Sequence, residues 1–291
     1  LAEVLNRPGL PLERAVEEYQ EEWALEVVKL QNSARNSTEW FETVERYLDS
    51  CPRFMSEYGF QGMPDLSTIR GFAGKGPLAI DSPVLKAHQK FLAGEGNARL
   101  MLYLEQRLRK PRDFADLVYL TQVNQAQAID MAARHHRGCR PVTLGSLYWQ
   151  LNDTWPAISW ASVDYNGQWK LLHYAARRFF APQAVVAEHK DGATRVALVS
   201  DATAPIAAEW RIRAFDMAGN ALGTKGAAVT LEPLGAQEVA SVADAELFAG
   251  AEAKASFAVA ELLIDGRSVS RTIVERALPR DMAYPAPALT A

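Results

Sequence analysis

The sequence has few cysteines, no long apolar run and no excess of positive charge. Each of these absences excludes a class of protein. No apolar stretch approaches the roughly 18 residues that span a bilayer, so we predict no membrane segment. The 291 residues carry a formal net charge of −4, with a pI near 5.8. Nucleic-acid-binding proteins have a high pI or a strongly basic face, which this net charge does not indicate. The charge favours a small uncharged ligand instead.

Only two cysteines are present, Cys51 and Cys139. They lie far apart in the sequence without companions at metal-ligand spacing, so we expect neither a disulfide-rich scaffold nor a metal site. Their scarcity fits a reducing compartment and an exported bacterial protein equally, which leaves both cytoplasm and periplasm open if the source is bacterial. The first residues lack an initiator Met and the pattern of a signal peptide, so we expect the chain to begin inside a longer or processed protein.

The first 180 residues alternate helical and short apolar segments. Three- and four-residue spacing of apolar side chains predicts helices, and two apolar runs too short for helices predict buried strands at 52–61 and 142–151. Helix followed by strand is the rhythm of an α/β domain with parallel strands, with Pro64 and Pro83 in first helical turns. The predicted helices are 11–34, 37–48, 64–73, 82–91 and 113–137.

The pattern changes after a linker near Pro182. In 207–215, Ala and large apolar residues alternate with Glu209, Arg211 and Arg213, which is typical of a half-buried strand. Turn-forming sequences separate the segments at the spacing of a β-sandwich. The predicted strands are 184–190, 194–200, 207–215, 227–232, 236–241, 256–263 and 267–274.

Glu57 follows a short apolar run and precedes an aromatic–Gly–aromatic turn. In barrels of alternating strands and helices, functional groups project from the C-terminal ends of strands. A carboxylate desolvated between Tyr58 and Phe60 suits a nucleophile or an acid/base. The competing interpretation is an ion pair with an arginine such as Arg53, and position alone does not choose between the two.

Residues 145–160 combine aromatic rings with amide and carboxylate groups. Aromatic faces stack on the C–H face of a pyranose while polar groups bind its hydroxyls, so this composition favours carbohydrate. The alternative is that Trp155, Trp160 and Trp169 fill a barrel bottom or a domain interface. The side chains concerned are Tyr148, Trp149, Gln150, Asn152, Asp153, Trp155 and Trp160.

His135 and His136 are adjacent at the end of a predicted helix, where neighbouring residues do not face one partner. We interpret them as favourable charges at a helix C-terminus and not as metal ligands. The sequence contains no phosphate-binding loop, serine elbow or dinucleotide fingerprint, and it implies no cofactor.

Two long motifs carry a family resemblance. "PRFMSEYGFQGMPDLSTIRGFA" and "GSLYWQLNDTWPAISWASVDYNGQWKLLHYAARRFFAP" resemble the C-terminal half of the β-mannosidases of glycoside hydrolase family 2. The resemblance implies the C-terminal part of a TIM (β/α)8 barrel over 1–182, with its seventh and eighth strands, followed by an immunoglobulin-like β-sandwich over 183–291. It makes Glu57 the catalytic nucleophile. The substrate-binding residues that it implies are Trp149, Asn152, Asp153 and Tyr58.

The same resemblance exposes a departure. The family's acid/base is a Glu after an Asn, upstream of the nucleophile, and this sequence contains no Asn–Glu pair. A complete barrel also needs about 250 residues, more than precede the sandwich. We therefore expect a partial barrel that lacks its acid/base and is inactive or incomplete alone.

The leading hypothesis is a C-terminal portion of a retaining exo-β-mannosidase. It would hydrolyse non-reducing terminal β-mannosides of an oligosaccharide or glycan once the missing N-terminal portion is present. One alternative is a non-catalytic carbohydrate-binding or scaffold fragment. Another is a related family 2 glycosidase that acts on a different β-glycoside. No hypothesis includes a nucleic acid or membrane partner.

Overall fold

The computed structural model describes residues 11, 13–14, 16–17, 44–91 and 93–286. The chain forms two compact units, Leu1–Arg46 and Tyr47–Ala291. In the first, residues 13–14 and 16–17 are helical and residue 11 is not, and the other residues of the helix predicted over 11–34 lie outside the described residues. The segment predicted as a helix over 37–48 is described only from Val44 to Leu48, which forms the 3-10 helix η1. None of the described helices is long and apolar enough to cross a membrane.

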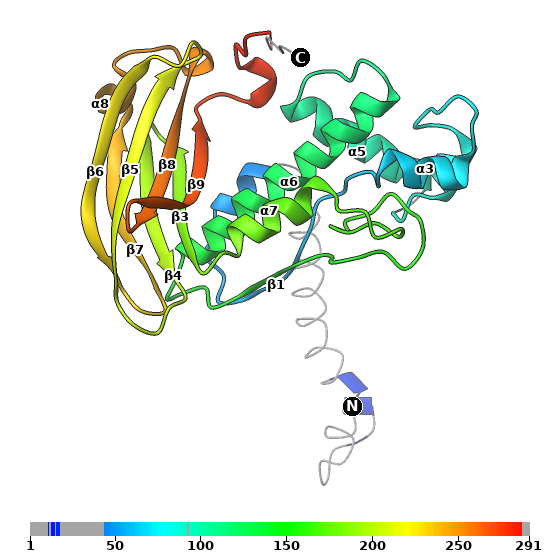
Figure 1. Ribbon diagram of the computed structural model, residues 1–291. Helices are drawn as coiled ribbons and strands as arrows, with labels where there is room; N and C mark the ends of the chain where they lie inside the picture. Colours follow the sequence, from blue (N-terminus) through cyan, green and yellow to red (C-terminus); the bar gives the residue numbers. More distant parts are fainter. Residues whose placement is uncertain (1–10, 12, 15, 18–43, 92, 287–291) are drawn as a thin grey trace. The chain divides into compact units, whose positions relative to one another are not determined.

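Within the described residues of the second unit, five α-helices precede the sandwich (Figure 1). The Asp65 side chain accepts a hydrogen bond from the Ser67 N–H and begins α3, and Pro83 occupies the first turn of α4 as predicted. Pro64 instead precedes the cap residue Asp65, so its predicted first-turn position is wrong. The helices are α3 (Leu66–Ala73), α4 (Pro83–Ala87), α5 (Ala93–Arg107), α6 (Phe114–Gly138) and α7 (Leu171–Phe179).

Helices α3 to α6 share one apolar core. It contains Met63, Ile69, Leu85, Leu104 and Leu117, all buried. The sequence pattern did not predict α5 or α7. Their apolar residues nevertheless have helical spacing: Leu100 and Leu104 of α5 lie four residues apart and both face this core.

Strands β1 (Met55–Tyr58) and β2 (Ser146–Tyr148) form a parallel two-stranded sheet. Their parallel pairing confirms the predicted α/β arrangement, but the prediction that both are buried is wrong. In β1 only Tyr58 is buried, and no residue of β2 is fully buried. The reason is that within the described residues this sheet has two strands only, so no further strand covers its edges.

The C-terminal part is an immunoglobulin-like β-sandwich, as predicted. All seven predicted strand segments are strands, in one sheet of order β3-β4-β7 and another of order β6-β5-β8-β9. Short helices α8 (Asp244–Phe248), η2 (Ala253–Ala255) and η3 (Pro279–Asp281) complete it. The strands are β3 (Gln183–Lys190), β4 (Ala193–Ser200), β5 (Ile206–Asp216), β6 (Ala221–Leu231), β7 (Gly235–Ala243), β8 (Ser256–Ile264) and β9 (Arg267–Glu275).

The sandwich core follows the predicted alternation. Trp210 and Ile212 of β5 point inward and pack with Val196 and Leu198 of β4. On the opposite face of β5, Arg211 and Arg213 donate to the Glu261 carboxylate at 2.8 and 3.0 Å. The boundary predicted between residues 182 and 183 lies inside the second compact unit and stays a prediction.

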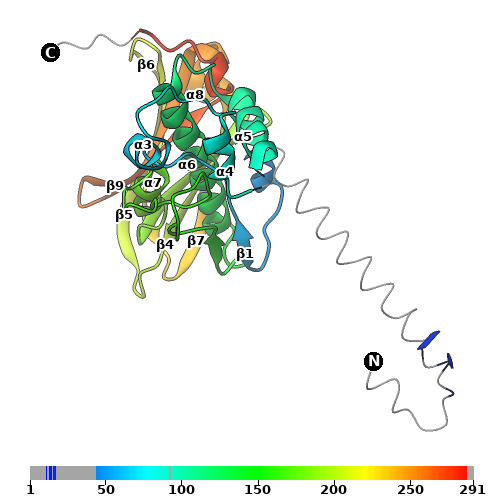
Figure 2. The same ribbon diagram turned by 90° about the vertical axis from the view of Figure 1, so that its right-hand side faces the viewer.

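Helix α6 lies against the outer face of the three-stranded sheet (Figures 1 and 2). Arg134 donates to the backbone oxygen of Val185 at 2.8 Å, and Arg137 donates to the Asp201 carboxylate at 2.9 Å. Val186 of β3 and Val199 of β4 are buried on this outer face. Both faces of β3 and β4 are therefore covered, which explains why their sequences read as nearly continuous apolar runs.

Candidate active site

The ends of β1 and β2 bring together the two main predicted site residues. Met55 is paired with Ser146 and Tyr58 with Tyr148, and the Trp149 N–H donates to the Tyr58 oxygen at 2.7 Å. Because the strands are parallel, their C-terminal ends meet at one edge, which carries Glu57 and Trp149.

Glu57 is exposed, and among the described residues no hydrogen bond or ion pair engages its carboxylate. The alternative of an ion pair with Arg53 is therefore not realised. The expected desolvation between aromatic neighbours is also wrong, since the side chain is open to solvent while Tyr58 turns inward. An open carboxylate at a strand end is free to meet a ligand.

Trp149 follows β2 directly and its indole is 49% exposed. The chain at Gly59 passes so close that a Cβ there would lie 2.6 Å from the Trp149 backbone oxygen. Position 59 therefore requires glycine, and the carboxylate-bearing strand is held against the tryptophan. The Trp149–Gln150 peptide bond is cis.

Tyr58, predicted to bind substrate, lies buried behind the sheet edge with 2% exposure. Its hydroxyl lies 3.3 Å from the Ser146 hydroxyl, and its ring packs edge-on against His136 at 5.1 Å. Burial raises the pKa of Tyr58 to about 12. As placed, Tyr58 anchors β1 to β2 and to α6 and does not reach the exposed edge.

Asn152 and Asp153 have different environments. Asn152 is exposed, and its side-chain amide only makes a 3.4 Å contact with the Asp153 oxygen, so it is available to a ligand. Asp153 is buried, with Lys90 donating to one carboxylate oxygen at 3.1 Å and Ser159 to the other at 2.7 Å. Its role in this structure is to hold the loop after β2, and the predicted direct contact with substrate is not supported by its placement.

The tryptophans predicted to fill an interior do not all do so. Trp155 is 37% and Trp169 is 49% exposed, and Trp160 is intermediate. Trp169 packs edge-on against His173 at 4.4 Å. For Trp155 and Trp169 the interior alternative is wrong within the described residues, and an exposed aromatic surface follows the end of β2.

Several supporting residues gave no sequence signal. Gln125 of α6 donates to the backbone oxygens of Phe60 at 2.8 Å and Trp160 at 3.0 Å, joining the segments that follow the two strands. The fully buried Lys170 donates to the Gly62 oxygen at 2.8 Å, and burial lowers its pKa to about 7. Asn, Gln and Lys inside a helix or loop are ordinarily surface residues, so only the fold reveals these contacts.

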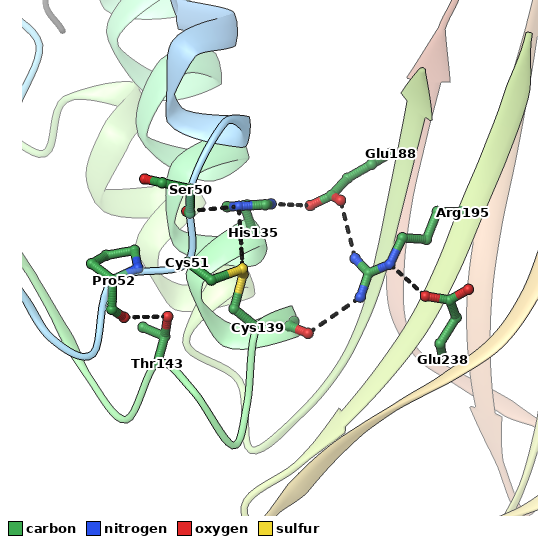
Figure 3. Close-up of a disulfide and its surroundings, with 10 residues drawn as sticks. Ser50, Cys51, Pro52, His135, Cys139, Thr143, Glu188, Arg195 and Glu238 are labelled. Carbon is green, nitrogen blue, oxygen red and sulfur yellow. Dashed lines mark hydrogen bonds and ion pairs between the residues drawn. A yellow bond between two sulfur atoms is a disulfide. The ribbon is translucent and has the colours of Figure 1, made fainter. Parts of the chain in front are cut away.

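The two cysteines form a disulfide, Cys51–Cys139, across 88 residues (Figure 3). From the sequence we excluded a disulfide-rich scaffold and did not predict this single bond, because separation in the sequence says nothing about distance in the fold. Cys51 precedes β1 and Cys139 caps α6, so the bond ties the entry of β1 to the helix behind it. The Thr143 hydroxyl donates to the Pro52 oxygen at 2.5 Å in the same region.

His136 differs from the predicted charge at the helix C-terminus. His136 is buried and neither ring nitrogen has a partner within the described residues. Burial, with the neighbouring His135, lowers the pKa of His136 to about 4, so the neutral ring contributes no helix-end charge near neutral pH. His135 lies between Glu188 and the disulfide.

Comparison with known proteins agrees with this architecture. Residues 192–288 match the family model described as a mannosidase Ig/CBM-like domain. The chain is 40% identical over 153 residues to the β-mannosidase of Capra hircus, with 48% of this chain and 17% of the relative covered. It is 40% identical over 161 residues to β-mannosidase B of Aspergillus niger, with 52% and 19% covered. About half of the chain is thus homologous to part of these β-mannosidases.

Solved structures share the fold. A β-D-mannosidase from Dictyoglomus thermophilum superposes with a TM-score of 0.78 at 24% identity, covering 84% of this chain and 30% of that one. An exo-chitosanase from Amycolatopsis orientalis gives a TM-score of 0.61 at 16% identity, covering 78% and 27%. The homologous segment thus spans less than a third of the proteins that it matches.

Proposed function

We propose that this β-mannosidase homologue supplies the seventh and eighth barrel strands and the C-terminal sandwich of a retaining exo-β-mannosidase. Glu57 is the nucleophile, and Trp149 forms a wall of the terminal-sugar pocket. The observation that carries the proposal is the parallel pairing of β1 with β2, which places Glu57, with an exposed carboxylate, and Trp149, with an exposed indole, at the same end of the sheet. The names of the relatives support β-mannosides as the substrate class.

The chemistry requires a second carboxyl group. In a retaining glycosidase, one carboxylate attacks the anomeric carbon as the other carboxylic acid protonates the leaving oxygen. The resulting glycosyl ester is hydrolysed by a water that the second group deprotonates, and the two carboxyl groups lie about 5–5.5 Å apart. This chain lacks the Asn–Glu pair that carries the second group by resemblance, so the remainder of the protein provides it.

The exposed apolar surface of the strand pair supports a missing partner. Phe54, Leu144 and Leu147 are 53%, 74% and 59% exposed on or next to β1 and β2. Contiguous exposed apolar side chains beside unpaired strand edges mark an interface. We assign this surface to the other strands of the (β/α)8 barrel, which cover it in the complete protein.

The Glu57 assignment is tested in the full-length protein. Glu57→Gln keeps the shape of the side chain but removes the nucleophilic charge, so kcat for an aryl β-mannoside falls by roughly 10⁴-fold or more. Glu209→Gln, an exposed carboxylate of β5, serves as the matched control and retains full activity. Wild-type turnover in the Glu57 variant would refute the assignment.

A chemical rescue identifies the role as well as the residue. In Glu57→Ala, azide occupies the space of the carboxylate and attacks the face opposite the leaving group, so an activated β-mannoside yields α-mannosyl azide. Loss of the acid/base instead leaves the nucleophile intact and gives the β-azide. Product anomeric configuration, read by NMR, therefore distinguishes the two roles.

The sugar preference and the non-catalytic alternative need separate measurements. A panel of aryl β-mannoside, β-galactoside, β-glucuronide and β-glucosaminide on the full-length protein decides the substrate, and β-mannoside is expected to have the highest kcat/KM. Mannose titration followed by tryptophan fluorescence tests binding by Trp149. Saturable binding without turnover of any glycoside would favour the binding or scaffold alternative.

A further inference from the structure

A set of potential metal ligands lies away from the edge that carries Glu57. The His135 Nε2 is 3.4 Å from the Cys139 sulfur and 4.0 Å from the Cys51 sulfur (Figure 3). One ligand atom from each of the three residues lies within 4.8 Å of the others. For tetrahedral zinc, with Zn–S near 2.3 Å and Zn–N near 2.0–2.1 Å, the nitrogen–sulfur separation is about 3.6 Å. The two observed separations lie on either side of this value.

The elements that supply these ligands suit a chelate. His135 and Cys139 are four residues apart at the end of α6, so they lie on the same face. Cys51 comes from the segment before β1 and is exposed, whereas the other two are buried. The site therefore has a closed side formed by protein and an open side at Cys51, where a water or another fourth ligand has access.

A carboxylate orients the imidazole. The His135 Nδ1 lies 2.9 Å from the Glu188 carboxylate, which directs Nε2 toward the sulfur atoms. Arg195 holds Glu188 at 3.1 Å and is itself held by Glu238 at 2.7 Å (Figure 3). Metal-binding histidines almost always donate their second ring N–H to such an acceptor, which fixes the tautomer and ring orientation. Here that arrangement is built across the contact between α6 and the sandwich.

We propose that reduction of the disulfide converts Cys51, His135 and Cys139 into a zinc site, with Glu188 as the orienting group. Zinc binds cysteine thiolates and histidine imidazoles, whereas Mg²⁺ and Ca²⁺ prefer oxygen ligands. The metal form retains the connection between the entry of β1 and α6 that the disulfide makes. The disulfide and the zinc-bound form are mutually exclusive states of this site, connected through the reduced, metal-free thiols.

The interconversion balances with a dithiol or phosphine reductant. A dithiol reduces the disulfide by two electrons, leaving two cysteine thiols and the oxidised reductant. Zn²⁺ then replaces both thiol protons and forms two zinc–sulfur bonds and one bond to Nε2. In the disulfide form Nε2 lies 3.1 Å from the Ser50 oxygen, and metal binding requires it to give up this contact.

The test uses the full-length protein, reduced and then freed of reductant, with a thiol count of two at these positions checked first. Added Co²⁺ is expected to produce a thiolate-to-metal charge-transfer band and intense tetrahedral visible bands, and stoichiometric Zn²⁺ to abolish them. The oxidised protein should give neither. Absence of the bands in the fully reduced protein would overturn the proposal.

Variants separate ligands from the orienting residue. Cys51→Ser should remove the charge-transfer signal of one thiolate, and Glu188→Gln should weaken Zn²⁺ binding by about 10–100-fold while the ligand set is kept. His189→Gln is the matched control, since His189 pairs with Asp244 at 3.1 Å without a cysteine nearby. Unchanged Zn²⁺ affinity in both Cys51→Ser and Glu188→Gln would contradict the site.

A measurement on the unmutated protein tests the proposal even if the variants fail to fold. Reduced Cys51 is exposed and should be alkylated rapidly by iodoacetamide, and one equivalent of Zn²⁺ should slow this reaction at least 10-fold. Equal alkylation rates with and without Zn²⁺ would overturn the proposal. Since neither readout uses glycoside turnover, this test is independent of the proposed β-mannosidase activity.

Discussion

The strands of the sandwich bury their side chains between two sheets, whereas the β1–β2 pair leaves much of its surface exposed. Every strand of the sandwich has a partner in one of two sheets, and side chains such as Trp210 and Val196 are buried between them. The β1–β2 sheet has two strands within the described residues and exposes Leu144 and Leu147. The sandwich completes its own core, whereas the strand pair is held by α6 and the disulfide and leaves apolar side chains exposed.

Reduction of Cys51–Cys139 should affect the two regions unequally, and this is the largest stability effect that we expect. The bond closes a loop with a sequence separation of 88, for which the chain-entropy model gives about 4–5 kcal/mol. With reductant and a chelator present, amides of β1 and α6 should exchange faster, while those of β5 and β8 keep their protection.

The measurement is hydrogen exchange of reduced and oxidised protein at one pH. Cys51→Ser/Cys139→Ser, compared with the reduced wild type, is the control for effects of the reductant. Equal loss of protection in both regions would show that the sandwich and the strand pair unfold as one unit and would remove the contrast between them.

Two tryptophans, one in each region, sharpen the same contrast with one substitution each. Trp210→Ala empties the sandwich core, where the side chain is 4% exposed, and should lower the free energy of unfolding by about 3–5 kcal/mol. Trp149→Ala removes an indole that is half exposed, so we expect a loss below about 1 kcal/mol. Urea denaturation of the full-length protein measures both. A larger loss from Trp149→Ala would mean that its indole is a core residue and not a pocket wall.

The most accurate predictions from the sequence concern the helices and strands whose apolar residues recur with a regular period. Alternation in β5 identified its inward residues, and the long apolar stripe identified α6, because each element buries one face against its own neighbours. The resemblance correctly predicted a β-mannosidase homologue. The pairing of β1 with β2, and with it the common edge of Glu57 and Trp149, followed from the rhythm of helices and strands.

The remaining features depend on contacts between distant segments. The apolar run that contains β2 predicted burial, but burial of a strand requires neighbours on its faces and edges, which two strands lack. Asp153 reads as a polar loop residue, yet Lys90 and Ser159 bind it in the interior. The cysteine pair became visible only when α6 brought Cys139 beside Cys51. No local pattern encodes such contacts.

A third expected effect, smaller than those of the disulfide and of Trp210, concerns the contact between the strand pair and α6. His136 packs edge-on against Tyr58 with its ring buried, and burial lowers its pKa from 6.5 to about 4. Between these values the unfolded chain binds more protons than the folded one, so stability is full above about pH 6.5 and falls as the pH drops through about 4. Between pH 7 and 4.5 this contribution falls by about 2–3 kcal/mol. The difference between the denaturation midpoints at pH 7 and pH 4.5 should therefore be smaller in His136→Gln than in the wild type. His189→Gln is the control and should keep the wild-type difference. An unchanged difference in His136→Gln would show that other groups control the acid sensitivity of this contact.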